Sequence, residues 1–171
     1  MNLSDSRVIN ADRPTVWSAI LDPEVLMTCV PGCQEMDGTP EDGFTATVVQ
    51  KVGPVKATFK GAVTLSEMQA PESVTISGEG KGGAAGFAKG GAKVRLEEQG
   101  DQTVLHYDVE AKVGGKLAQL GSRIIDGFAK KMADQFFNNF QDHVGAPPAE
   151  DTEPETSDDA PKKGWLKRLV T

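Results

Sequence analysis

A change in the spacing of apolar residues constrains this chain most. From Gln34 to Val113 apolar and polar residues alternate, which is typical of β-strands with one buried face. The alternation is clearest in residues 55–65, and Val52-Gly53-Pro54-Val55 just before them predicts a hairpin turn. From Gly114 to Phe140 the period changes to about 3.6, which indicates one long amphipathic helix. The helical stripe consists of Leu117, Leu120, Ile124, Phe128, Met132, Phe136 and Phe140.

The N-terminal region predicts one strand and two short helices. Residues 3–10 have strand character, and Asp12 and Asp22 each stand where a helix N-cap is expected, close to a proline. Pro31-Gly32 ends the second helix. The chain is therefore expected to be an α+β protein, with an antiparallel sheet of six or seven strands and a long C-terminal helix that lays one face on it.

Charge is unevenly distributed along the 171 residues, whose formal net charge is −7. Residues 150–161 hold six acids and no base, and residues 162–171 hold four bases and no acid. A net negative domain argues against nucleic-acid binding, because the phosphate backbone is met by Lys and Arg. We find no signal-peptide pattern and no apolar run near the ~18 residues of a membrane span, so a cytoplasmic location is expected.

The composition divides the chain into three parts. Residues 1–144 are expected to form one domain, 145–161 an acidic, proline-rich disordered linker, and 162–171 a basic amphipathic tail. Such a tail suits an anionic membrane surface or a groove on a partner protein, and the sequence leaves both open. The residues expected to dock are Lys162, Lys163, Trp165, Leu166, Lys167, Arg168 and Leu169.

Motifs for catalysis or metal binding are weak. Residues 78–83 match G-x-G-x-x-G, but a strand pattern follows them instead of a helix, so a flexible strand-to-strand loop is expected. Cys29 and Cys33 do not have a zinc spacing, and only two histidines could complete a site. No catalytic residue and no metal ligand are therefore assigned. Phe87, within the glycine-rich stretch, is either a lid over an apolar cavity or a core residue.

The order of elements resembles the helix-grip fold of the START-like superfamily, the polyketide cyclase/dehydrase and lipid-transport proteins. Several motifs are similar to the family of the carbon monoxide dehydrogenase G subunit. They are Pro31-Gly32-Cys33, residues 52–61 from Val52-Gly53-Pro54 onward, Gly80-Lys81-Gly82, and residues 115–127 with Gly121-Ser122-Arg123 at their centre. Together they cover the chain to about residue 143.

The resemblance implies a non-enzymatic accessory protein of a molybdenum-containing hydroxylase such as carbon monoxide dehydrogenase. It also implies peripheral association with the inner face of the cell membrane and a link to the quinone pool, with ubiquinone or menaquinone as the possible ligand. A pure recruitment adaptor without a ligand, and a cyclase or hydrolase of the same superfamily, remain alternatives.

The resemblance implies a bent sheet wrapped around the long C-terminal helix with an apolar cavity between them, and the alternation and the helical stripe supply apolar residues for its wall. Tyr107 is either the group that orients a quinone carbonyl or a core tyrosine. Small inward residues such as Ala57 leave room for a ligand. The residues expected to line the cavity are Val48, Ala57, Phe59, Phe87, Tyr107, Val109, Leu117, Leu120, Ile124 and Phe128.

Overall fold

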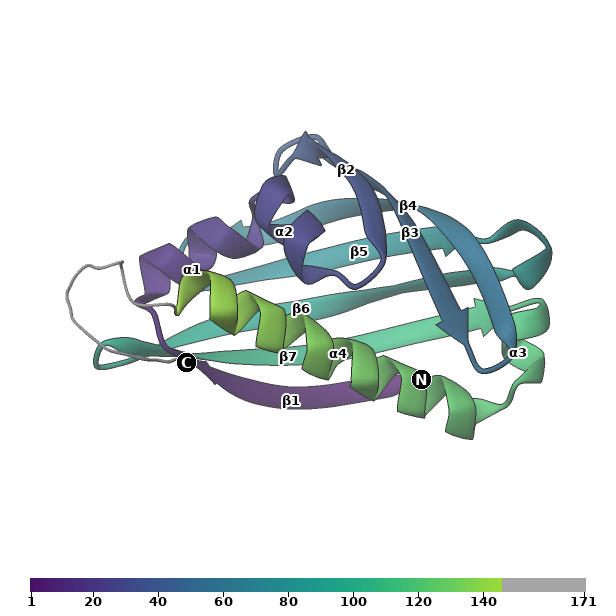
Figure 1. Cartoon of the computed structure of the whole chain (residues 1–171). Helices are drawn as coiled ribbons and strands as arrows, with labels where there is room; N and C mark the ends of the chain where they lie inside the picture. The colour runs from purple at the N-terminus through teal and green to yellow at the C-terminus, as the bar shows by residue number, and fades with distance from the viewer. Residues whose placement is uncertain (146–171) are drawn as a thin grey trace, which may run out of the picture.

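The computed structural model describes residues 1–145, which form one seven-stranded sheet and a set of helices on its concave face (Figure 1). The elements in chain order are β1 (Asn2–Ile9), α1 (Arg13–Ile20), α2 (Pro23–Cys29), β2 (Cys33–Thr39), β3 (Gly43–Val52), β4 (Val55–Gln69), β5 (Ser73–Lys81), the 3₁₀ turn η1 (Gly83–Ala85), β6 (Phe87–Gln99), β7 (Gln102–Gly114), α3 (Lys116–Gln119) and α4 (Ser122–Val144). The α+β prediction is confirmed. The predicted linker and tail lie outside the described residues.

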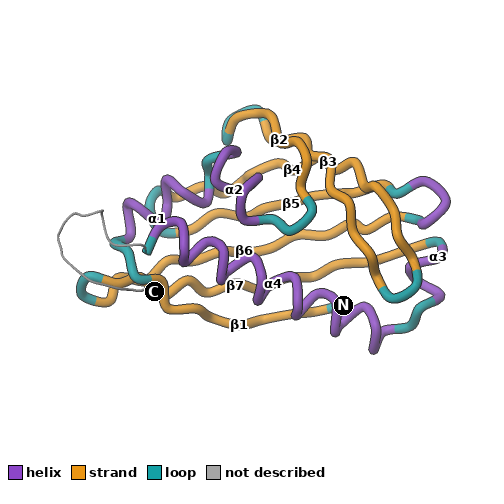
Figure 2. The backbone as a smooth tube through the Cα atoms, in the orientation of Figure 1, coloured by secondary structure: helices purple, strands orange, loops and turns teal. Residues whose placement is uncertain are grey.

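All neighbouring strands are antiparallel, in the order β1-β7-β6-β5-β4-β3-β2, and the sheet is not closed into a barrel. The predicted hairpin joins β3 to β4, with Val52 opposite Val55 and Val48 opposite Phe59. Along β4 half-buried and exposed residues alternate from Val55 to Leu65, as the sequence predicts. Figure 2 shows the bent sheet with α4 lying across its inner side.

Side-chain caps begin the two short helices. The Asp12 carboxylate accepts a hydrogen bond from the backbone N–H of Thr15 at 2.9 Å, and Asp22 accepts one from Glu24 at 2.9 Å. Each bond satisfies an N–H group that has no partner within its helix. The hydrogen bonds from Thr15 lower the pKa of Asp12. Both predicted helix starts are therefore confirmed.

The predicted single C-terminal helix is wrong in one respect, because two helices form. Gly121 separates α3 from α4 and has a φ of +91°, in a region that L-residues rarely adopt. At the start of α4 the buried residue is Ile125, which is only 9% exposed, whereas Ile124 is 42% exposed. The predicted stripe therefore begins one residue too early on α4.

Aromatic side chains fix the C-terminal half of α4 to the sheet. Phe140 is fully buried, and its ring stacks on that of Phe136 with centroids 5.9 Å apart. The Phe137 ring stacks on Tyr107 of β7 at 5.1 Å, and the Arg7 guanidinium lies 5.1 Å from the Phe137 centroid. These contacts join α4 to β1 and β7 at the end of the molecule that carries α1 and α2.

Arg7 also ties α4 to the sheet through a charged contact. Its guanidinium donates to the Asp134 carboxylate at 2.5 Å and to the Tyr107 hydroxyl oxygen at 3.4 Å. Burial lowers the pKa of Arg7, but the hydrogen bonds to Asp134 and Tyr107 outweigh it, so the pKa is raised. Arg7 is therefore a cation held against an aromatic ring and a carboxylate.

Truncation of Phe140 should destabilise the whole domain. Phe140→Ala removes a fully buried ring and is expected to lower the free energy of unfolding by about 3–5 kcal/mol. Met68→Ala, at a residue 40% exposed, is the control and should change it by less than about 0.5 kcal/mol. Urea denaturation followed by circular dichroism measures both. A loss below about 1 kcal/mol for Phe140→Ala would contradict this account of the core.

Candidate functional site

Small residues form the inner face of the sheet under the N-terminal half of α4. Across neighbouring strands Gly61 lies opposite Gly80, Gly80 opposite Ala88, and Gly90 opposite Ala111. Glycine and alanine present little or no side-chain volume, so the sheet leaves space there that larger residues would fill. At the other end of the same face the space is taken by the aromatic side chains described above.

This space is an apolar cavity of about 250 Å³ between the sheet, α3 and α4. Strands β3, β4, β5, β6 and β7 form one side, and the two helices form the other. The lining residues are Met1, Val48, Gln50, Val52, Phe59, Gly80, Ala88, Ala111, Val113, Leu117, Ile125, Phe128, Ala129 and Met132.

The two polar groups near this cavity are held by backbone carbonyls. Gln50 has the one polar side chain of the lining, and its amide nitrogen donates to the carbonyl of Pro31. The ammonium group of Met1 donates to the carbonyl of Ala111 at 3.0 Å. Gln50 therefore turns its amide toward Pro31. A site of this kind favours an apolar ligand and offers no titratable side chain for acid–base chemistry.

Four of the predicted cavity residues line this cavity: Val48, Phe59, Leu117 and Phe128. Ala57 lies on β4 opposite Gln50, one position beyond the lining. Val109 packs against the core at the aromatic end. Neither lines the cavity.

Leu120 and Ile124 lie at the junction between α3 and α4. A Cβ atom built on Gly53 would lie 3.5 Å from Ile124 Cγ2 and 3.9 Å from Leu120 Cδ1. The two side chains therefore cover the β3–β4 turn. Ile125 takes the place predicted for Ile124 in the cavity wall.

Tyr107 does not line the cavity, so its predicted role of orienting a ligand is not supported by its position. Its ring is 5% exposed, stacks on Phe137, and its hydroxyl oxygen accepts from Arg7. Of the two readings that the sequence left open, the core tyrosine agrees with this structure.

Phe87 is neither a lid over the cavity nor a core residue. It begins β6 on the outer face of the sheet, opposite Lys81 and Gly114, and is 42% exposed. Its ring covers Gly114, where an added Cβ would come within 2.3 Å of Phe87 Cε1. The ring is directed away from the cavity because residue parity places Phe87 on the same face as Lys89.

The sequence prediction missed Gly80, Ala88 and Ala129 of the cavity wall. Gly78 and Gly80 were assigned to a flexible loop, but both lie within β5, and Gly90 lies within β6. Their shared parity with Val74 and Val94 was the signal that could have placed them on the inner face. Ala129 follows from Ile125 at helical spacing once the break at Gly121 is known, and Met132 already belongs to the predicted stripe.

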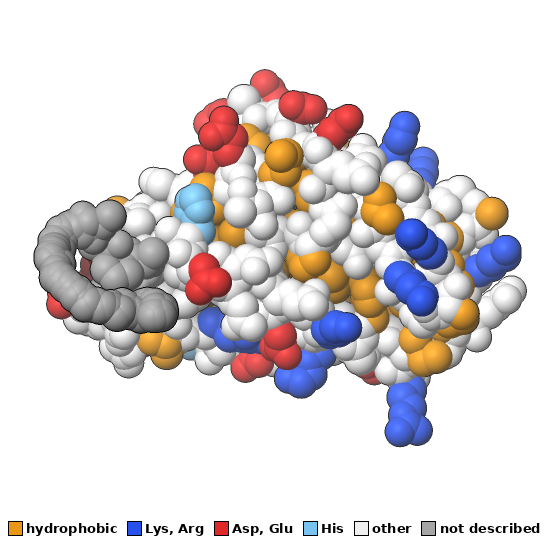
Figure 3. All heavy atoms as spheres, viewed as in Figure 1, with side chains coloured by type: hydrophobic (Ala, Val, Ile, Leu, Met, Phe, Trp, Pro, Cys, Tyr) orange, Lys and Arg blue, Asp and Glu red, His pale blue; other side chains and the backbone are white. Residues whose placement is uncertain are grey.

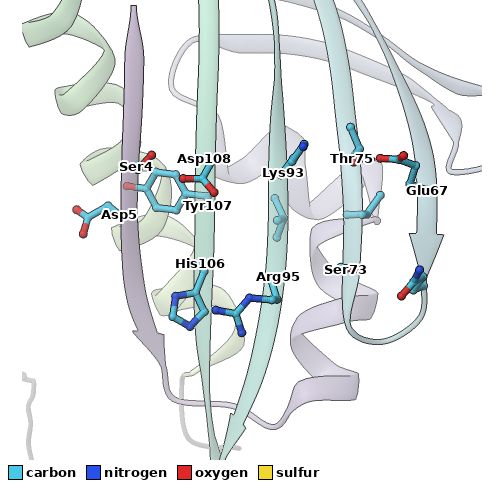
Figure 4. A pocket seen from close by; sticks show the side chains of 13 residues that line it. Ser4, Asp5, Glu67, Ser73, Thr75, Lys93, Arg95, His106, Tyr107 and Asp108 are labelled. Atoms are coloured by element: carbon cyan, nitrogen blue, oxygen red, sulfur yellow. Dashed lines mark hydrogen bonds between the residues drawn. The ribbon is translucent and has the colours of Figure 1, made fainter.

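A larger hollow of about 730 Å³ lies on the outer face of the sheet and has a different chemistry (Figure 4). Charged side chains project there from neighbouring strands, among them Lys93 and Arg95 of β6 and Asp108 of β7. His106 is within 2.9 Å of Glu97, and this hydrogen bond lowers the pKa of Glu97. Both signs of charge meet in this hollow, so it is unsuited to an apolar ligand.

The two cysteines are free. Cys29 is fully buried, and burial raises the pKa of its thiol; burial also raises that of Cys33. Residues 1–145 contain no group of three or more His, Cys, Asp and Glu side chains placed to hold a metal ion. Within the same residues, every helix is too short or too polar to cross a membrane.

Solved structures with similar folds come from several bacteria. A conserved protein from Geobacillus kaustophilus is 28% identical, with a TM-score of 0.79 over 84% of this chain and 95% of that one. A START superfamily protein from Mycobacterium smegmatis is 16% identical, with a TM-score of 0.63 over 84% and 96% of the two chains. A protein from Thermus thermophilus is 10% identical, with a TM-score of 0.63 over 84% and 97%.

These similarities confirm the helix-grip, START-like fold that the order of elements predicts. A comparison with curated proteins finds no match. Residues 6–145 match the family of the carbon monoxide dehydrogenase G subunit, CoxG. This match spans the whole sheet except the first residues of β1, and it includes α3 and α4. The chain therefore belongs to the CoxG family, that of the carbon monoxide dehydrogenase G subunit.

Proposed function

We propose that this protein is a non-enzymatic accessory protein of a molybdenum-containing hydroxylase of the carbon monoxide dehydrogenase type. In this proposal it binds an isoprenoid quinone, or a similar lipid, and couples the enzyme to the membrane quinone pool. The observation that carries the proposal is the apolar cavity between the sheet and α4. The name of the family supports the choice of partner enzyme.

The size of the cavity limits which part of such a ligand it holds. Ligand sites for small molecules commonly measure ~300–1,000 Å³. At about 250 Å³ the cavity suits a ring headgroup or a few isoprene units, and a longer chain has to extend beyond it. Its apolar wall offers the ligand burial from water, which stabilises binding by about 25 cal/mol per Å² of apolar surface.

The character of the wall supports a binding role over an enzymatic one. General acid–base catalysis needs a positioned titratable group within hydrogen-bond reach of the reacting atoms. The lining side chains are apolar except Gln50, whose amide is bonded to the Pro31 carbonyl.

Membrane recruitment is assigned to residues 162–171, which lie outside the described residues. Each Lys or Arg near an anionic bilayer contributes about 1 kcal/mol of binding free energy, and Trp165 suits the membrane interface. A recruitment adaptor without a ligand is the second candidate function, and the modest volume of the cavity favours it.

Filling the cavity should separate the carrier from the adaptor. Ala88→Leu places a larger side chain in the cavity wall and is expected to weaken binding of a short-chain quinone at least about tenfold. Ala62→Leu, on the outer face of β4, is the matched control and should leave binding unchanged. Displacement of the neutral fluorescent probe N-phenyl-1-naphthylamine measures both, and native mass spectrometry of the purified protein identifies any ligand retained from the cell.

Failure of the wild-type protein to bind quinones of any chain length would rule out the carrier and leave the adaptor. Because Ala88→Leu could overpack the wall, Ala129→Leu on α4 provides a second test from the opposite side. Both variants should keep cooperative unfolding.

Deleting residues 162–171 should reduce recruitment without touching the cavity. We expect less protein and partner enzyme in the membrane fraction, while quinone affinity in solution stays within about twofold of wild type, because the cavity is formed by residues 1–132. Membrane fractionation and probe displacement measure the two effects. Unchanged membrane association would contradict the role proposed for the tail.

A further inference from the structure

Three pairs of lysines face each other directly across neighbouring strands. The pairs are Lys51 with Lys56, Lys60 with Lys81, and Lys89 with Lys112. Like charges directly opposite each other destabilise a sheet. The like-charge pairing by itself therefore does not stabilise the sheet.

All six lysines project from the outer face at one end of the sheet and are exposed. We call this surface the basic end. It includes the β3–β4 turn and the turn from β5 to β6. Two acids lie on this face: Glu79 directly opposite Lys89, and Glu110 two residues from Lys112. Among residues 1–145 the ion pairs within 4.0 Å involve other residues, so none of the six ammonium groups has an acidic partner at that distance.

Charge is separated along the domain. Figure 3 shows Lys and Arg side chains gathered at the end that carries α3 and the β3–β4 turn, whereas Asp and Glu side chains gather over β2. The domain therefore has a positive end, although the net charge of the whole chain is −7. Such a separation orients a protein in the field of a charged surface before contact is made.

Two exposed apolar side chains accompany the lysines. Phe87 is 42% exposed and lies opposite Lys81, two residues from Lys89. Ile124 is also 42% exposed and lies beside the β3–β4 turn. Basic residues with an exposed aromatic and an aliphatic side chain are typical of surfaces that enter the interface of an anionic bilayer.

The basic end also adjoins the apolar cavity. Val52, Leu117 and Ile125 belong to the cavity wall, and each lies next in sequence to an exposed residue of this end: Lys51, Lys116 and Ile124. The cavity wall and the basic end therefore lie at the same end of the domain, with the strand lysines on the outer face of the sheet and the cavity on the inner face.

We propose that the basic end is a docking surface for an anionic lipid bilayer, separate from the C-terminal tail, and that it brings the cavity against the membrane. The docking itself rests on charge and exposed apolar area and does not depend on quinone binding. Its purpose, the exchange of a lipid ligand between bilayer and cavity, rests on the proposed function.

An acidic protein surface would need, besides its acids, an apolar contact placed for each of Phe87 and Ile124, whereas a bilayer needs no such match. A bilayer accounts for both, because its headgroups take the charge while its interface takes the apolar side chains. We therefore commit to the bilayer, and an acidic partner becomes an outcome of the test.

The test uses the full-length protein and vesicles of phosphatidylcholine with phosphatidylglycerol, with phosphatidylcholine vesicles as the uncharged comparison. The variant Lys81→Gln/Lys89→Gln/Lys112→Gln removes three charges from the basic end. Its control, Lys93→Gln/Arg95→Gln/Lys131→Gln, removes three charges elsewhere. Each lysine at an anionic surface is worth about fivefold in the partition coefficient. We expect the first variant to lose at least about tenfold and the control to lose less than about threefold.

The apolar contribution is tested by Phe87→Ser against Met68→Ser, two residues of nearly equal exposure at opposite ends of β4–β6. Only Phe87→Ser should weaken vesicle binding.

All variants are also made with Trp165→Ser/Leu166→Ser in the full chain, which lowers the contribution of the tail. Removing like-charge pairs should leave the lysine variant at least as stable as wild type in thermal unfolding.

Equal losses of vesicle binding in the two triple variants would overturn the proposal. No loss in either variant would also overturn it, and would favour an acidic protein as the partner of the basic end. Probe displacement in solution is measured on the same variants and should not change. Loss of quinone binding in wild type would overturn the proposed function but not the docking, whereas vesicle binding insensitive to the lysines would overturn the docking alone.

Discussion

The packing of the C-terminal half of α4 against the sheet sets the position of this helix, and the cavity depends on that position. Phe136, Phe137 and Phe140 fill the space at one end, where Phe137 stacks on Tyr107 and Phe140 is fully buried. These rings hold the helix at a fixed height above the strands. At the other end the facing residues are glycine and alanine, so the same helix leaves about 250 Å³ unfilled. The cavity is therefore a consequence of where the large side chains are placed.

The polar groups of the inner face are arranged to keep this space apolar. Gln50 bonds to Pro31, and Arg7 is engaged by Asp134 and Tyr107 away from the cavity. Charge is instead concentrated on the outer face and at the ends of the domain. The inner face is therefore the apolar side of the domain, whereas the outer face and the ends carry most of its charge.

Much of the fold could be predicted from the spacing of apolar residues. Alternation placed Val48 and Phe59 on the inner face, and Asp12 and Asp22 marked the helix starts. The break at Gly121 could not be predicted from the stripe, because a glycine at this position fits a continuous helix as well as a turn. The phase of α4 then depended on tertiary structure, and Ile125 took the place predicted for Ile124.

The candidate site was predicted less well than the fold, because a cavity depends on what is absent from a surface. The prediction relied on large side chains and therefore considered Tyr107 as a ligand contact. The ring of Tyr107 instead belongs to the aromatic core. Glycines suggested a flexible loop, although Gly80 and Gly90 lie within strands and Gly80 lines the cavity. Phe87 faces outward because strand parity, and not hydrophobicity, sets its direction. The cross-strand lysine pairs could not be predicted from the sequence, because they depend on the register between the strands.

The central claim is that the space left under the N-terminal half of α4 is the ligand site. Methyl NMR of the labelled protein, titrated with a quinone that carries one isoprene unit, tests it most directly. The account predicts shift changes at Val113, Ile125 and Met132 of the cavity wall, with Ile9 and Leu105 of the aromatic core unaffected. Changes confined to the outer face, or none at saturating quinone, would contradict it.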